Sequence, residues 1–114
     1  MRRWSLLPLL LVAGCSKGPQ ADLPYIGEAR SLAAEWALVN EQANENKLTD
    51  TYVRTMRESV RKQLRTTARS LTQPDSEYAR EIDALLREPD AAAPAVLRTH
   101  ADRLKRIEDS LESA

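Results

Sequence analysis

Several residue types are scarce in this chain of 114 residues. It contains no phenylalanine, one cysteine, one histidine and three glycines. A single cysteine cannot form an internal disulfide. One histidine and one cysteine are also too few for zinc sites or catalytic triads, which need several converging groups. We therefore predict no catalytic residue, no metal site and no cofactor.

The charge balance gives no sign of a nucleic-acid partner. Lysine and arginine together number 17, as do aspartate and glutamate, so the formal net charge is zero. Without Arg2 and Arg3, the remaining chain has 15 basic residues against 17 acidic ones. Nucleic-acid-binding domains usually carry a clear basic excess. We therefore expect no nucleic-acid partner.

The first fifteen residues have the layout of a secretory signal. Arg2 and Arg3 precede an apolar run at residues 4–12, and the small residues Ala13 and Gly14 then lead to Cys15. This order of basic, apolar and small residues is typical of export signals. The apolar run is too short to span a bilayer.

The segment Val12-Ala13-Gly14-Cys15 resembles the lipobox of bacterial lipoproteins, in which leucine is the commonest residue at the position of Val12. The resemblance implies that residues 1–14 are a signal peptide and that Cys15 is acylated. Three acyl chains would anchor the protein without a transmembrane helix. Because Ser16 stands where an aspartate would retain such proteins at the inner membrane, the resemblance favours the outer membrane, facing the periplasm. The alternative is an ordinary signal peptide cut near a cysteine.

The mature chain divides into a tether and a domain. The Gly18-Pro19 pair interrupts regular structure, so we expect residues 15–23 to form an acylated cysteine and a short tether. Residues 24–114 are rich in alanine, leucine, glutamate, arginine and glutamine, which favour helices. We expect them to form a single helical domain.

Apolar residues recur at spacings of three and four, which predicts four amphipathic helices. The expected ranges are 24–44, 49–71, 75–87 and 94–112, with Thr49 capping the second helix and prolines marking the later breaks. The residues expected to face the core are Tyr25, Ala29, Leu32, Trp36, Val39, Ala43, Val53, Met56, Val60, Leu64, Ala68, Leu71, Tyr78, Ile82, Leu85, Leu86, Leu97, His100, Leu104, Ile107 and Leu111.

This pattern predicts an all-α fold, a small antiparallel bundle of three to four amphipathic helices. The competing arrangement is an open helical hairpin that a partner chain completes. Both satisfy the same apolar stripes, and the sequence leaves the oligomeric state open.

A row of basic residues lies beside the apolar stripe of the second helix. Its members, the candidate interaction face, are Arg54, Arg57, Arg61, Lys62, Arg65 and Arg69. Only two acids offset them, whereas the segment 75–90 carries six acids against two arginines. The favoured interpretation is that these opposite charges pair and align neighbouring helices, together with Glu28 and Glu35. The alternative is that some arginines face an anionic lipid, a lipopolysaccharide or an acidic protein.

Three other side chains have two possible roles. His100 lies on the apolar stripe of the last helix, where a hydrogen-bonded core histidine is the favoured interpretation over a pH-sensitive contact. Trp36 and Tyr25 also lie at stripe positions, where they are expected in the core rather than in a ligand platform.

These features together predict a membrane-anchored periplasmic lipoprotein that acts without catalysis. The favoured role is a structural or accessory interaction protein of the cell envelope, docked against an envelope protein. The alternative is a binding module for anionic lipid or glycan that uses the arginine-rich face of the second helix.

Overall fold

The computed structural model describes residues 18–114, so the predicted signal peptide and Cys15 lie outside the described residues. Within that range the protein is all-α, as predicted, and contains no strand. The elements are a short 3₁₀ helix η1 (Pro19–Asp22) followed by the α-helices α2 (Leu23–Asn44), α3 (Asp50–Ser70), α4 (Glu77–Leu86) and α5 (Pro94–Glu112).

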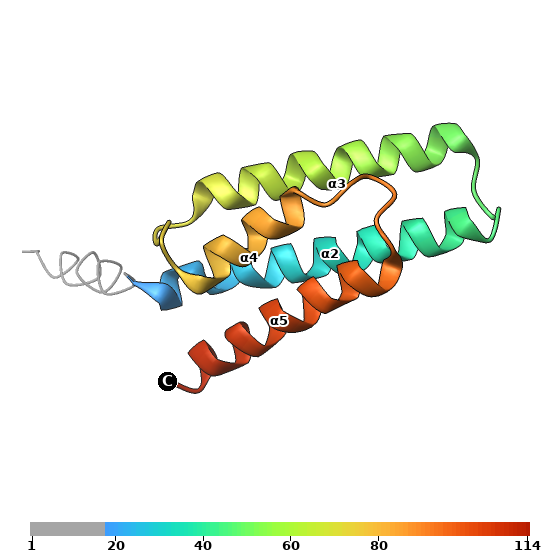
Figure 1. The fold of residues 1–114 in the computed structure, drawn as a ribbon. Coiled ribbons are helices and arrows are strands. Elements are labelled where there is room, and N and C mark those ends of the chain that lie inside the picture. The colour runs from blue at the N-terminus through green and yellow to red at the C-terminus, as the bar shows by residue number, and fades with distance from the viewer. Residues whose placement is uncertain (1–17) are drawn as a thin grey trace, which may run out of the picture.

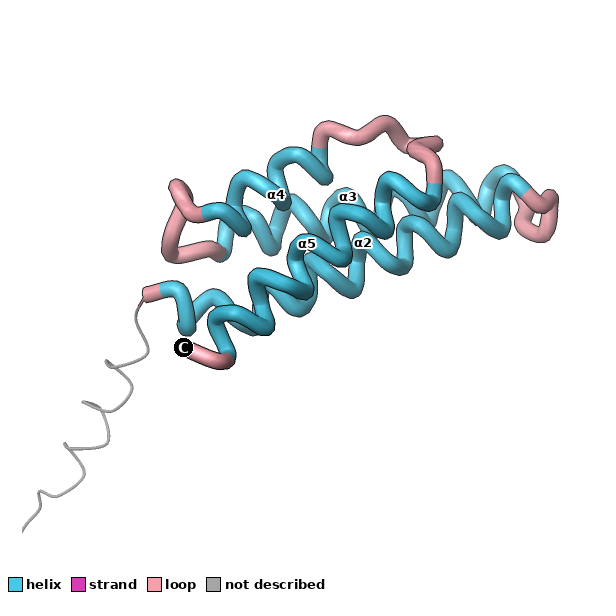
Figure 2. Tube along the Cα trace, turned by 60° about the horizontal axis from the view of Figure 1, so that its bottom comes forward, coloured by secondary structure: helices cyan, strands magenta, loops and turns pink. Residues whose placement is uncertain are grey.

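Helix α2 is the central element of the bundle (Figure 1). Helix α3 folds back along one side of it, and α5 packs antiparallel along the other. The shorter α4 lies between α3 and α5 and also contacts α2. Figure 2 shows that the C-terminus and the α3–α4 loop lie at the end of the bundle where η1 begins, whereas the α2–α3 turn lies at the opposite end. We call the latter the hairpin end.

Local sequence signals place the helix boundaries close to the predicted ranges. The Thr49 hydroxyl accepts a hydrogen bond from the Tyr52 amide at the start of α3, which confirms the predicted cap. Ser76 caps α4 in the same way through the Ala79 amide. Such hydroxyls satisfy amides that have no partner within the helix. The last helix spans the predicted residues 94–112.

The core is wider on α2 than the predicted stripe. Four residues of the stripe are buried as expected, namely Ala29, Leu32, Trp36 and Val39, whereas Tyr25 and Ala43 are only half-buried. Three residues outside the stripe are buried as well: Ile26, Ala33 and Ala37. The reason is that three helices cover α2 from different sides. A stripe of heptad spacing describes contact with one neighbour only.

The helical domain begins before the predicted residue 24. Pro19–Asp22 form the 3₁₀ helix η1, and Asp22 is 0% exposed. Its carboxylate accepts hydrogen bonds from the Thr72 amide at 2.9 Å, the Gln73 amide at 3.2 Å and the Tyr78 hydroxyl at 2.5 Å. These donors compensate the buried charge. Asp22 therefore fixes the start of the domain against the α3–α4 loop, which shortens the predicted tether.

Substitution of Asp22 by alanine is expected to destabilise the bundle. The change leaves the part-buried amides of Thr72 and Gln73 and the buried Tyr78 hydroxyl without this acceptor, at a cost of about 1–3 kcal/mol. Urea unfolding followed by circular dichroism measures this loss. Asp102→Ala, at an exposed position on α5, is the control and should change stability by less than about 0.5 kcal/mol. Equal stability of the two variants would contradict the role of Asp22.

Burial, and then the hydrogen bond to Asp22, raises the pKa of Tyr78 to about 12 from its ordinary value of 10.0. The folded state therefore favours the neutral phenol. The raised pKa of Tyr78 therefore contributes to the unfolding free energy. This contribution is complete below pH 10 and is lost as the pH rises toward 12. Measured against pH, the unfolding free energy of the variant Tyr78→Phe should not show the decline between pH 10 and 12 that comes from this tyrosine. The variant Tyr52→Phe, at an exposed position, should still show it. Identical pH profiles for the two variants would refute the assignment.

Candidate interaction surface

The predicted basic row of α3 is divided between the inside and the outside of the bundle. Arg57 and Arg61 are half-buried and bond to groups on other elements. The exposed members are Arg54, Lys62, Arg65 and Arg69. In the part of the chain that the structure describes, these four form no ion pair. The row is therefore not a single surface.

Arg61 joins α3 to α2 and to the segment that follows α4. Its guanidinium lies 5.1 Å from the centroid of the Trp36 ring, within the range of a cation–π contact. The same group donates to the carbonyls of Glu88 at 2.9 Å and Leu86 at 3.2 Å. It also pairs with Asp90 at 3.3 Å, although Asp90 is largely exposed. The bond to Leu86 satisfies a carbonyl at the C-terminal end of α4, and the bond to Glu88 satisfies one in the loop that follows.

Asn40 is a second connection, which the sequence pattern did not predict. Its side chain is 1% exposed, and its amide donates to the carbonyls of Asp90 at 3.0 Å and Ala92 at 2.8 Å. Its oxygen accepts from Arg57 at 2.9 Å, and the indole of Trp36 also donates to the Asp90 carbonyl. The sequence contains one indication of this role, which is an asparagine among the apolar residues of α2. A buried amide needs hydrogen-bond partners for both its donor and its acceptor.

The favoured charge-pairing hypothesis is supported for Arg61 and Asp90 only. Among the described residues, Glu28 and Glu35 pair with no member of the row. In the acidic segment, Glu81 and Glu88 contact His100 instead. Alignment of α3 therefore depends mainly on arginine bonds to neutral carbonyls and an amide, whose positions cannot be read from charge patterns.

His100 is a buried, hydrogen-bonded histidine, as its stripe position predicted. It is 5% exposed. Its Nδ1 lies 2.6 Å from Glu81 and its Nε2 lies 2.8 Å from Glu88, so the ring connects α5 to α4 and to the α4–α5 loop. Trp36, at 0% exposed, is also a core residue, whereas Tyr25 is half-buried at the edge of a shallow groove between α2 and α3.

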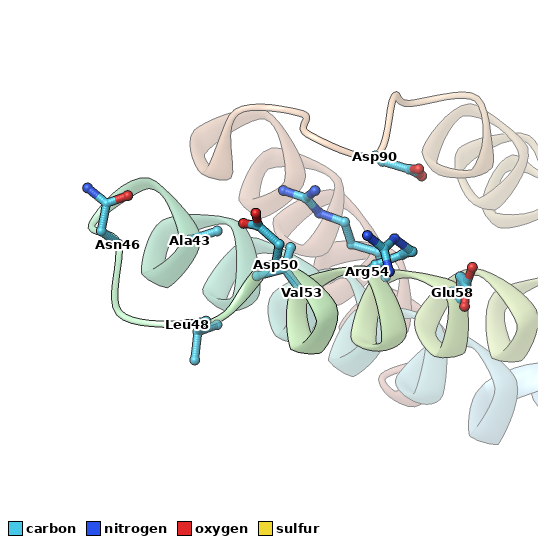
Figure 3. A pocket seen from close by; sticks show the side chains of 9 residues that line it. Ala43, Asn46, Leu48, Asp50, Val53, Arg54, Glu58 and Asp90 are labelled. Atoms are coloured by element: carbon cyan, nitrogen blue, oxygen red, sulfur yellow. The ribbon is translucent and has the colours of Figure 1, made fainter.

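An open groove of about 600 Å³ lies at the hairpin end, between the end of α2, the start of α3 and the α4–α5 loop (Figure 3). We call it the hairpin-end groove. Ala43, Leu48 and Val53 supply apolar surface, and Arg54 projects from α3. The polar lining is completed by Asn46, Asp50, Arg57, Glu58 and Asp90. Both charge signs around a small apolar surface suit a polypeptide better than a simple anion.

The described residues contain neither a metal site nor a membrane-spanning helix. Among residues 18–114, no group of three or more histidine, cysteine, aspartate or glutamate side chains could hold a metal ion. Over the same range, no helix has the length and apolar character needed to cross a bilayer. In comparisons with known proteins, no family model, no curated protein and no solved structure matches the chain.

The division of the basic row predicts unequal effects of two arginine substitutions one helical turn apart. Arg61→Ala removes the Trp36 contact and two bonds to carbonyls, and should lower the unfolding free energy by about 1–3 kcal/mol. Arg65→Ala, at an exposed position, should change it by less than about 0.5 kcal/mol. Urea titrations monitored by circular dichroism measure both values. A loss at Arg65 as large as that at Arg61 would contradict the division.

Proposed function

We propose that this protein is a lipid-anchored, non-catalytic accessory protein of the bacterial cell envelope, which faces the periplasm and docks against a protein partner through the hairpin-end groove. The anchor is Cys15, by resemblance of residues 12–15 to a lipobox. Ser16 after that cysteine favours the outer membrane.

The observation that carries the proposal is the position and chemistry of the hairpin-end groove. It lies at the opposite end of the bundle from η1, the element nearest to Cys15 in the sequence. A groove at this end is directed away from the proposed anchor, toward a partner. Arg54 is exposed there, and the partly covered Leu48 lines the same groove. A partner segment with an apolar side chain for Leu48 and a carboxylate for Arg54 would complement both.

A non-catalytic role agrees with how the most reactive side chains are used. Both ring nitrogens of His100, the only histidine, contact carboxylates inside the bundle. Arg57 and Arg61 bond to groups of the fold itself. The histidine is thereby held inside the fold, which supports a binding role over a catalytic one.

The proposal predicts that a discrete envelope protein is recovered with the acylated protein after cross-linking in living cells. Arg54→Glu should lower this recovery at least tenfold, because it places a negative charge where the partner presents one. Arg106→Glu makes the same charge change at an exposed position in the C-terminal half of α5, away from the hairpin end, and should leave recovery unchanged. Circular dichroism verifies that both variants are folded.

Two outcomes would refute parts of the proposal separately. Mass spectrometry that finds an unmodified Cys15 in the membrane fraction would refute the anchor. Acylated protein that recovers no protein above background, or loses its partner equally in both variants, would refute docking through the hairpin-end groove.

A further inference from the structure

Three exposed cations form a continuous basic surface on the C-terminal half of α3. Lys62, Arg65 and Arg69 recur at spacings of three and four, so they lie on one side of the helix over about 10 Å. We call them the outer basic surface. Between residues 59 and 70 the sequence has no acid, and its remaining cation, Arg61, is turned toward Trp36.

The fold does not explain these three charges. In the described part of the chain, none of them forms an ion pair or a side-chain hydrogen bond to another element. Arg69 lies in the last turn of α3, where a cation stabilises the helix dipole. That effect is confined to the last turn, so it does not account for Lys62 or Arg65.

The outer basic surface also lies close to the start of the domain. The Asp22 carboxylate bonds to the Thr72 and Gln73 amides, directly after the end of α3. Only three residues separate Cys15 from Pro19, and this length of chain spans at most about 14 Å. A lipid at Cys15 would therefore hold the end of α3 near the bilayer surface.

From these observations we infer that the outer basic surface contacts the anionic phosphates of the lipid bilayer, so that the C-terminal half of α3 lies against the membrane and the hairpin end is tilted away from it. This inference rests on the proposed acylation of Cys15. Basic residues close to an anionic membrane are attracted to it, each by roughly fivefold in partition. The contact fixes the orientation of the bundle and leaves the hairpin-end groove accessible to a partner.

The test uses the full acylated protein reconstituted into vesicles, with a fluorophore on a single introduced cysteine. Acylation occupies the Cys15 thiol, so the new cysteine is the only reactive one. Thr66→Cys places the label beside the outer basic surface, and Thr51→Cys places it at the start of α3 as the matched control. A quencher attached to the lipid headgroup reports the distance of each label from the membrane.

In phosphatidylglycerol vesicles at low salt, we expect the Thr66 label to be quenched at least threefold more than the Thr51 label. The difference should disappear in phosphatidylcholine vesicles, which carry no net negative charge. It should also disappear in 1 M salt, where charges are screened beyond about 3 Å. The third condition that should abolish it is the variant Lys62→Glu/Arg65→Glu/Arg69→Glu. We expect this variant to fold, because none of the three residues forms an ion pair with another described element. Circular dichroism checks that it does.

The outcomes separate this inference from the anchor. Acylated protein that floats with phosphatidylglycerol vesicles but leaves the Thr66 label unquenched would overturn the orientation and retain the anchor. Equal quenching in neutral vesicles or in the charge-reversed variant would overturn the role of phosphate. Protein that carries no acyl group would refute the anchor, and the orientation with it.

Discussion

Packing of α2 against three other helices is the constraint on which the rest of the bundle depends. Its apolar residues contact α3, α4 and α5 on different sides, and Trp36 and Ile26 are fully buried. Burial of one large apolar side chain stabilises the folded state by about 1.5–3 kcal/mol. Because α3 and α5 do not contact each other in the described part of the chain, they are held relative to each other mainly through α2, with which both make their most extensive contacts.

Two polar connections fix the positions of the loops, which apolar packing of the helices leaves undetermined. Asp22 holds the start of the domain to the α3–α4 loop, and Asn40 with Arg61 holds the α4–α5 segment to α2 and α3. Both connections use buried or half-buried side chains to satisfy backbone groups outside regular helices. Hydrogen bonds of this kind are directional, so they fix where each loop lies, whereas apolar contacts tolerate sliding.

The three proposed features share one geometric relation. Cys15 precedes η1 in the sequence by a few residues, the outer basic surface approaches the same end of the bundle, and the hairpin-end groove is at the other end. An anchor, a membrane-facing side and a partner-facing end would thus occupy separate parts of one small domain. This separation allows each to be altered without changing the others.

The sequence by itself determined the helices and the cap of α3 at Thr49. Apolar spacing, proline and capping hydroxyls such as that of Thr49 act within a few residues of the chain, so a linear pattern contains them. Only the tertiary structure decided the partners of the polar side chains. Arg61 and Arg65 are one helical turn apart and look alike in the sequence, but the backbone of Leu86 and Glu88 lies beside Arg61 alone. That difference arises from residues some 25 positions away, brought close only when α4 packs against α3.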